Sequence, residues 1–288
     1  MNKSKNLLSH RSEEPEHGVL YLVGTPIGNL NDLSSRAVNI LKNVSLIACE
    51  DTRTTRKIMT KFNISNKLIS FNKHNSLSKI PRIISDLQDE KSIAVVSDAG
   101  MPSICDPGED MVKAVKSEGF DVICIPGPCA AITALVSSGM PSSSFVFEGF
   151  LPKKKNEREK ILLEISKRKK TTIIFESPHR IKNLLEELFE FCGGEREIEV
   201  ARELTKKYEE HICNDIENVI KFFTNKRVMG EFTVVIKGLD EKKDPLINKK
   251  YLKKELDELV EAGLSVSRAS KYLAKKNGIK KSIIYNLE

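Results

Sequence analysis

Short loops rich in glycine, proline and aspartate follow four apolar runs in the first half of the chain. These runs, at 20–23, 46–49, 93–96 and 122–125, are typical of buried strands. In a parallel α/β sheet the loops at the carboxyl ends of the strands share one edge, where small molecules bind. The pattern therefore predicts an enzyme with a ligand site on that edge. The loops are Gly24-Thr25-Pro26-Ile27-Gly28-Asn29, Glu50-Asp51-Thr52-Arg53, Ser97-Asp98-Ala99-Gly100-Met101-Pro102 and Pro126-Gly127-Pro128.

Motifs of several common enzyme classes do not occur in the sequence. Gly24 and Gly28 do not complete the three-glycine dinucleotide fingerprint, and Pro26 lacks the backbone N–H that a pyrophosphate would need. The sequence has no Walker A loop, no Gly-x-Ser-x-Gly elbow and no His-Glu-x-x-His zinc motif. Its 6 cysteines form no Cys-x-x-Cys pair. We expect no metal, and a group-transfer reaction whose reactive group arrives on a cofactor remains.

Strand-like and helix-like segments alternate along most of the 288 residues, which predicts α/β architecture with helices on the faces of the sheets. The Pro-Gly-Pro break predicts a domain joint. We expect a flexible tail at 1–17, an N-terminal α/β domain at 18–128 and a second α/β domain at 129–240. A charged linker and a small domain of short helices, similar to a helix-turn-helix unit, follow at 241–288. Plain packing and nucleic-acid binding are both open for these helices.

The net charge of +7 comes from 47 basic and 40 acidic residues. A solvated lysine-rich surface explains it as well as a polyanionic partner does. The first 17 residues lack the apolar core of a signal peptide, and no run approaches the roughly 18 apolar residues of a membrane helix. We therefore expect a cytoplasmic protein that does not enter a membrane.

An ordered set of motifs gives the chain a resemblance to a known family. It resembles the tetrapyrrole methylase-fold family, most closely its ribosomal RNA branch. The tetrapyrrole enzymes open with a Gly-x-Gly-Pro-Gly-Asp type of loop, whereas Gly24–Asn29 here is similar to the RNA branch. The matching segments are Leu22–Leu30, Cys49–Thr54, Phe71–Asn75, Ser97–Pro102 with Asp106-Pro107-Gly108, Ile125–Pro128, Phe150–Pro152, Phe175–Arg180, Ala201–Lys206 and Gly230–Phe232.

The resemblance implies a two-domain class III methyltransferase fold with a small C-terminal helical domain. It implies S-adenosyl-L-methionine folded in a cleft between the α/β domains and a homodimer. The implied reaction is 2′-O-methylation of a cytidine ribose in small-subunit (16S) ribosomal RNA near the decoding centre, on the RNA or on the 30S subunit. The cofactor-binding residues that it implies are Pro26, Asp98, Ala99, Gly100, Pro126, Gly127, Thr133, Ala134, Gly230 and Glu231.

Methyl transfer to a ribose hydroxyl requires the two reactants to be oriented and a proton to be removed. The candidate bases are Asp51, Glu176 and His179, and Glu50 and Glu203 are further candidates. The sequence does not rank them. Water could take the proton instead. The candidate phosphate-binding residues are Arg53, Arg56, Lys73, Lys153, Lys154, Arg180, Arg202 and Lys206.

Each of these residues also has a purely structural interpretation. Asp51 has the position of a helix N-cap, and Glu176 could pair with Arg180. The glycines could serve turns, Thr133 and Ala134 could pack a helix, and any single cation could form a surface ion pair. Two other functions stay open: a methylase of a tetrapyrrole such as a corrin or sirohaem precursor, and an RNA-binding assembly factor without catalysis.

Overall fold

The computed structural model describes residues 14–239 and 248–287, and it divides into two compact units. The first unit holds the described residues up to Ser137 together with Ala201–Glu210. The second holds Ser138–Val200 and the described residues from His211 onward. The chain therefore leaves the second unit at Val200, contributes a ten-residue loop to the first, and returns at His211.

A parallel sheet of five strands forms the centre of the first unit, in the order β3-β2-β4-β1-β5. Its strands are β1 (Val19–Val23), β2 (Leu46–Cys49), β3 (Leu68–Ser70), β4 (Ile93–Val96) and β5 (Asp121–Ile125). β1 pairs in parallel with β4 and β5, and β2 pairs in parallel with β3 and β4. The loops after β1, β2, β4 and β5 consequently lie at one edge.

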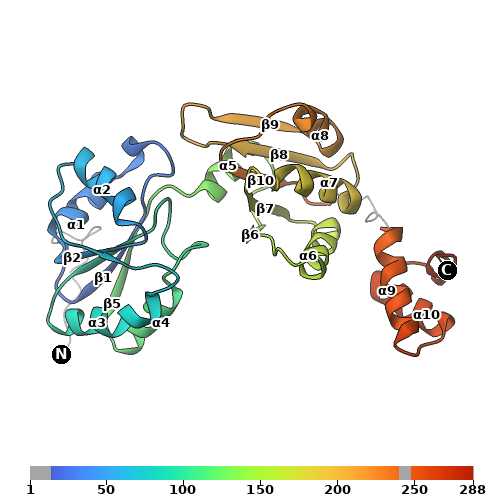
Figure 1. Cartoon of the computed structure of the whole chain (residues 1–288), viewed down its shortest axis with the longest axis horizontal. Coiled ribbons are helices and arrows are strands. Elements are labelled where there is room, and N and C mark those ends of the chain that lie inside the picture. Colours follow the sequence, from blue (N-terminus) through green and yellow to red (C-terminus); the bar gives the residue numbers. More distant parts are fainter. Residues whose placement is uncertain (1–13, 240–247, 288) are drawn as a thin grey trace. The chain divides into compact units, whose positions relative to one another are not determined.

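Helices cover both faces of this sheet (Figure 1). On one face α1 (Ser35–Asn43) and α2 (Thr52–Lys61) pack against Val19, Tyr21 and Val23. On the other face α3 (Ser76–Gln88) and α4 (Glu109–Ser117) pack against Leu20 and the alternate residues of β2 and β4. This alternation follows from the two-residue period of a strand, and it buries the apolar runs on both sides.

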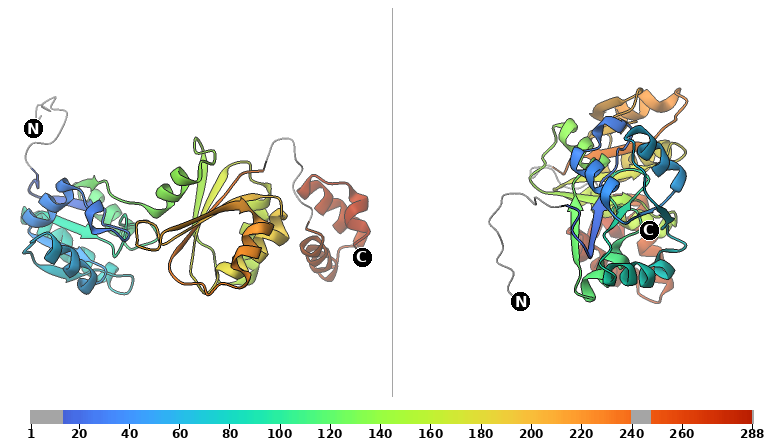
Figure 2. Two further views of the ribbon diagram at one scale, coloured as in Figure 1. Left: turned by 90° about the horizontal axis from the view of Figure 1, so that it is seen from above. Right: turned by 90° about the vertical axis from the view of Figure 1, so that its left-hand side faces the viewer.

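The second unit contains a mixed sheet of five strands in the order β6-β7-β10-β8-β9. The strands are β6 (Phe145–Phe150), β7 (Thr171–Glu176), β8 (Glu197–Arg202), β9 (Glu210–Asp215) and β10 (Phe232–Ile236). β7 pairs with β6 in parallel and with β10 antiparallel. The core joins the sheet to α6 (Lys155–Lys167), α7 (Ile181–Cys192) and α8 (Ile216–Thr224), and Figure 2 gives two further views.

Three short helices end the described chain. They are α9 (Lys249–Glu261), α10 (Val266–Asn277) and α11 (Lys281–Tyr285). Leu252, Leu256, Leu273 and Ile284 form their own small core. Gly278 ends α10 in the left-handed conformation at φ +66°, which glycine adopts without a steric cost.

The predicted α/β class and the alternation of elements are confirmed. The joint was expected after Pro128, whereas α5 (Ala130–Ser138), with Ala131, Ala134 and Leu135 buried, stays with the first unit up to Ser137. Most of the expected tail (1–17) and most of the linker lie outside the described residues. No helix among residues 14–239 and 248–287 is long and apolar enough to cross a membrane.

Candidate active site

Backbone contacts connect the loops at the carboxyl ends of the parallel strands in the first unit. We call these the rim loops. Thr25 and Gly100 form an antiparallel bridge, in which each N–H donates to the other's carbonyl at 2.9 and 3.1 Å. A Cβ at Gly24 would lie 2.7 Å from the Cα of Gly127. The two loops therefore touch through bare backbone, which only glycine permits at this distance. Pro26, between these contacts, is buried.

The loop contributed from Ala201–Glu210 lies against the same rim. The backbone N–H of Asn29 donates to the Thr205 hydroxyl at 3.0 Å, across 176 residues of sequence. A Cβ at Gly28 would meet the Lys206 side chain and would lie 3.1 Å from the Leu204 carbonyl. Glu203 and Thr205 have φ angles of +52° and +67°, uncommon for residues with a Cβ. No local pattern of residues predicts this contact.

Three carboxyl groups gather around the ends of β2 and β4. Burial raises the pKa of Glu50, and the carboxylates of Asp106 and Asp98 raise it further. Burial also raises the pKa values of Asp98 and Asp106. Lys73 opposes the shifts of Glu50 and Asp106, which places its ammonium within electrostatic reach of both. Asp106 was missed as a candidate, although Asp106-Pro107-Gly108 follows the Asp98 loop in the sequence.

Asp51 serves as the N-cap of α2. Its carboxylate accepts from the backbone N–H of Arg53 at 2.8 Å and pairs with the Arg53 guanidinium at 3.2 Å. These contacts lower the pKa of Asp51. Its own backbone N–H donates to the Asp98 carboxylate at 3.0 Å. The expected N-cap is therefore present, and Asp51 in addition ties the end of β2 to the end of β4.

The remaining cofactor candidates have diverse surroundings. In the first unit Ala99 and Pro126 are exposed at the rim. The Thr133 hydroxyl donates to the Cys129 carbonyl of its own helix at 2.9 Å, and Ala134 is fully buried, so the packing interpretation accounts for both side chains. Gly230 and Glu231 belong to the second unit, immediately before β10, where Gly230 has φ +97° and Glu231 is exposed.

Two of the candidate bases belong to the second unit. The Glu176 side chain is 0% exposed and pairs with Arg180 at 2.8 Å and with Arg158 at 3.5 Å. Arg158 is itself buried and also pairs with Glu187 at 2.7 Å. The predicted pairing of Glu176 with Arg180 is present, and Arg158 is the member that the sequence did not reveal. His179 is exposed in the loop before α7.

The candidate phosphate-binding side chains come from both units, and some of them form ion pairs. Arg56, Lys73 and Lys153 are exposed. Arg202 pairs with Glu210 at 3.4 Å, and Lys206 with Glu203 at 2.8 Å. Lys154 pairs loosely with Glu157 at 3.3 Å on the surface, and Arg53 is held by Asp51. Exposed pairs of this kind are weak and exchange readily for a phosphate.

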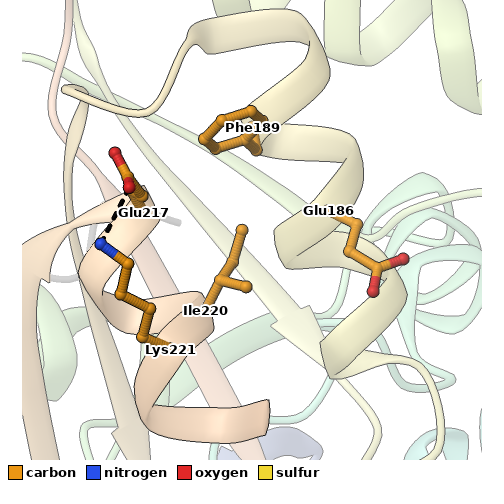
Figure 3. A pocket seen from close by; sticks show the side chains of 5 residues that line it. All are labelled: Glu186, Phe189, Glu217, Ile220 and Lys221. Atoms are coloured by element: carbon orange, nitrogen blue, oxygen red, sulfur yellow. Dashed lines mark ion pairs between the residues drawn. The ribbon is translucent and has the colours of Figure 1, made fainter.

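The described residues form surface hollows in both units, and a hollow of the first unit has Arg56 in its lining. Another lies between α7 and α8 of the second unit, where Phe189 and Ile220 line it beside Glu186, and Glu217 pairs with Lys221 at 2.8 Å (Figure 3). It contains no predicted site residue. Within the described part of the chain, no group of three or more His, Cys, Asp or Glu side chains has an arrangement that could hold a metal ion.

Sequence relatives cover nearly the whole chain. A model of the tetrapyrrole (corrin/porphyrin) methylases matches residues 19–220. A protein of Synechocystis sp. is 42% identical over 270 residues, which are 94% of this chain and 97% of that protein. A protein of Halalkalibacterium halodurans is 40% identical over 278 residues, 96% of both chains. Both are named ribosomal RNA small subunit methyltransferase I.

Solved structures share the fold at low sequence identity. A cobalt precorrin-4 methyltransferase superposes with a TM-score of 0.59 at 14% identity, covering 77% of this chain and 95% of that one. A uroporphyrin-III C-methyltransferase of Thermus thermophilus, complexed with S-adenosyl homocysteine, superposes with a TM-score of 0.52 at 15% identity, covering 75% and 96%. The predicted two-domain methylase fold is thereby confirmed. The chain belongs to the tetrapyrrole (corrin/porphyrin) methylase family, and within it to the group of the ribosomal RNA small subunit methyltransferases I.

Proposed function

We propose that this chain transfers a methyl group from S-adenosyl-L-methionine to the 2′-hydroxyl of a cytidine ribose in small-subunit (16S) ribosomal RNA. The observation that carries the proposal is the identity of about 40% with rRNA methyltransferases over more than nine-tenths of both lengths. Cytidine as the base, the 2′-oxygen as the acceptor, a homodimer and a cytoplasmic location come from the family resemblance and stay predictions.

The rim of the first unit suits the proposed cofactor chemically. S-adenosyl-L-methionine carries a positive sulfonium, a positive α-ammonium and the donor hydroxyls of its ribose. The carboxylates of Glu50, Asp98 and Asp106 supply negative charge and acceptors at the carboxyl ends of β2 and β4. The tightly laced backbone at Gly24, Gly100 and Gly127 would hold these groups in fixed positions. Ala99 and Pro126, which are exposed, would supply apolar contacts, and the buried Pro26 would hold its loop rigid.

The cofactor supplies the electrophilic methyl group, so the chain has to orient the ribose and accept its proton. The bond from the methyl carbon to sulfur breaks as the bond to the 2′-oxygen forms, and the hydroxyl proton leaves to a base. We favour Glu50 over Asp51, because a raised pKa makes a stronger base and because Asp51 already caps α2. Glu176 is occupied by two arginines, and His179 remains an exposed alternative.

The proposed RNA contacts come from cations in both units. Arg53, Arg56, Lys73, Arg202 and Lys206 belong to the first unit, and Lys153, Lys154 and Arg180 to the second; Arg180, Arg202 and Lys206 are half-buried and the others are exposed. Arginine binds phosphate through two parallel N–H groups, and lysine binds it as a point charge.

The test is transfer of a labelled methyl group from S-adenosyl-L-methionine to three acceptors offered separately: 30S subunits, naked 16S RNA and a tetrapyrrole precursor. We expect label in RNA from at least one of the first two. Label confined to the tetrapyrrole would contradict the proposal and assign the chain to the corrin and porphyrin methylases, whose fold it shares. Cofactor binding without label in any acceptor would also contradict it and would favour a non-catalytic assembly factor.

A further inference from the structure

The three C-terminal helices lie beyond the methylase fold, and their charges are segregated. The family model ends at residue 220, before α9 begins. Residues 262–287 contain no aspartate or glutamate, whereas α9 holds four acidic residues within 249–261. The basic residues of 262–287 are Arg268, Lys271, Lys275, Lys276, Lys280 and Lys281. Within residues 249–287 all the acidic residues therefore lie on the first helix, and the second and third helices are strongly positive.

The spacing of these residues along α10 places several of them on one face of the helix. Arg268, Lys271, Tyr272 and Lys275 stand at positions i, i+3, i+4 and i+7, so they share one face of the helix. We call these four residues the basic stripe. All are exposed, and the Tyr272 ring is 57% exposed. The opposite face, with Ala269, Leu273 and Ala274, is buried in the small core. The stripe runs along about 10 Å of helix, long enough to meet more than one phosphate.

The cations of the stripe form no ion pairs within the part of the chain that the structure describes. Lysines elsewhere form ion pairs, such as Lys113 with Glu109 at 2.6 Å and Lys254 with Glu159 at 2.9 Å. Across residues 14–239 and 248–287, by contrast, no carboxylate lies within ion-pairing distance of Arg268, Lys271 or Lys275. Lys280, in the turn before α11, is exposed and unpaired in the same range. Lys276 differs, because it pairs with Glu255 at 2.5 Å and therefore braces α10 against α9.

We propose that the basic stripe, with Lys280, binds the phosphate backbone of RNA, and that Tyr272 stacks on an unpaired base. Unpaired cations at helical spacing complement a chain of phosphates, and an exposed aromatic ring between them is the arrangement by which proteins hold unstacked bases. The choice of RNA over DNA rests on the proposed function. The stripe contains none of the residues proposed for the cofactor or the base, so the role that we infer for it is to hold the RNA and not to take part in methyl transfer.

The test compares two variants of the full chain that lose the same charge. The first carries Arg268→Gln, Lys271→Gln, Lys275→Gln and Lys280→Gln. The control carries Lys42→Gln, Lys61→Gln, Lys67→Gln and Lys116→Gln. These four lysines are also exposed, and they lie in the connections that enter the amino ends of β2, β3 and β5, at the sheet edge opposite the rim. All eight side chains are on the surface, so both variants should fold, which circular dichroism checks.

Dissociation constants for a 16S RNA fragment and for a DNA duplex of equal length are measured between 50 and 200 mM salt. For the stripe variant we expect RNA affinity to fall roughly tenfold or more, and the slope of log Kd against log salt to fall by about 3, near 0.7 for each lost contact. Its affinity for S-adenosyl-L-methionine should equal that of the parent. Tyr272→Ala should weaken RNA binding about fivefold or more without changing the slope.

Three results would overturn the inference: equal loss in both charge variants, no loss in the stripe variant, or parent binding to the DNA duplex as tight as to RNA. The outcome for the proposed function is separate. A parent that methylates RNA, with a stripe variant of unchanged Kd and KM, would remove the stripe and keep the methyltransferase. A parent that binds RNA through the stripe but transfers no methyl group would keep the stripe as an RNA-binding surface and contradict the proposed function.

Discussion

At the scale of single residues, the three rim carboxyls are the feature that most closely joins structure to chemistry. Glu50, Asp98 and Asp106 come from two strand ends and a following loop, and each is partly withdrawn from water. Their mutual repulsion is a cost to the folded state. Such costs are common where carboxyl groups are kept for a reaction or for a positively charged ligand.

Glu50→Gln should abolish most methyl transfer while leaving the affinity for S-adenosyl-L-methionine within a few fold. In the parent, activity should rise with pH through the raised pKa of Glu50, because only the carboxylate accepts a proton, and the variant should lack this rise. The measurement is a pH profile of single-turnover transfer. Glu118→Gln, at an exposed position after α4, is the matched control and should behave as the parent. An unchanged pH profile in the Glu50 variant would exclude Glu50 as the base.

The same substitution has a consequence for stability with a definite sign. A raised pKa means that folded Glu50 binds its proton more tightly than the unfolded chain does. The contribution of Glu50 to the free energy of unfolding is therefore fully present below the unfolded carboxyl pKa of about 4.3 and is lost as the pH rises through the raised value. Glu50→Gln removes this loss. Urea unfolding at pH 7 should show the variant at least as stable as the parent, and a large loss of stability would contradict this.

Glu176, unlike Glu50, has the contacts of a structural carboxylate, because it is buried between two arginines. Glu176→Ala should lower the free energy of unfolding by about 3–5 kcal/mol, because the buried Arg158 guanidinium loses a partner. Glu187→Gln is the comparison, since the Glu187 side chain is 33% exposed and its loss should cost less. The measurement is urea unfolding monitored by circular dichroism. Full stability with no methyl transfer in the Glu176 variant would return this residue to the list of bases.

The residue types of the site were predictable, but their roles were not. Asp98 and Gly100 could be found because they follow an apolar run, and chain order brings all such loops to one edge. Arg158 could not, because nothing in a helix of mixed charges marks one arginine as buried beneath Glu176. Glu50 and Asp51 are neighbours in sequence, and only their different surroundings separate a cap from a candidate base.

At the scale of elements, the loop at Ala201–Glu210 is the unusual part of the fold. It leaves β8, packs on the Gly28 loop and returns to β9. Positive φ angles at Glu203 and Thr205 cost energy that the contacts of the loop must offset. A loop held in this way can keep the Pro26 segment in the conformation that a cofactor needs.

Thr205→Ala should release the Asn29 amide, whose hydrogen-bond acceptor it removes. We expect hydrogen exchange at Asn29 to speed up roughly fivefold to tenfold, equivalent to the loss of about one net hydrogen bond, and cofactor affinity to fall severalfold. Thr205→Ser keeps the hydroxyl and should match the parent. Exchange that is unchanged in Thr205→Ala would mean that the loop does not hold the Gly28 segment.

Most elements followed from the sequence, and the exceptions have physical causes. The four apolar runs predicted strands β1, β2, β4 and β5 to within one residue at each end. β3 was missed because its three residues are only half-buried, so no long apolar run marks it. β9 was missed because most of its residues are polar, so no apolar run marks it. The position of residues 201–210 could not be predicted, because it depends on contacts with segments more than a hundred residues away.

At the scale of the whole molecule, the chain carries a net charge of +7. The exposed cations Arg56 and Lys73 of the first unit and those of the basic stripe on α10 are among the ones that we propose to meet RNA. RNA binding by the parent should therefore weaken steeply with salt, with a slope near 0.7 for each phosphate neutralised on single strands. A flat salt profile would contradict an RNA substrate.

The most direct test of the central claim identifies the methylated atom. 30S subunits are incubated with the protein and S-adenosyl-L-methionine labelled in its methyl group, and the 16S RNA is hydrolysed with alkali and separated by mass spectrometry. A 2′-O-methyl group blocks the adjacent phosphodiester from cleavage. The account predicts label in an alkali-resistant dinucleotide that begins with cytidine. Label in a single mononucleotide, methylated on its base, would contradict ribose methylation and the role given to Glu50.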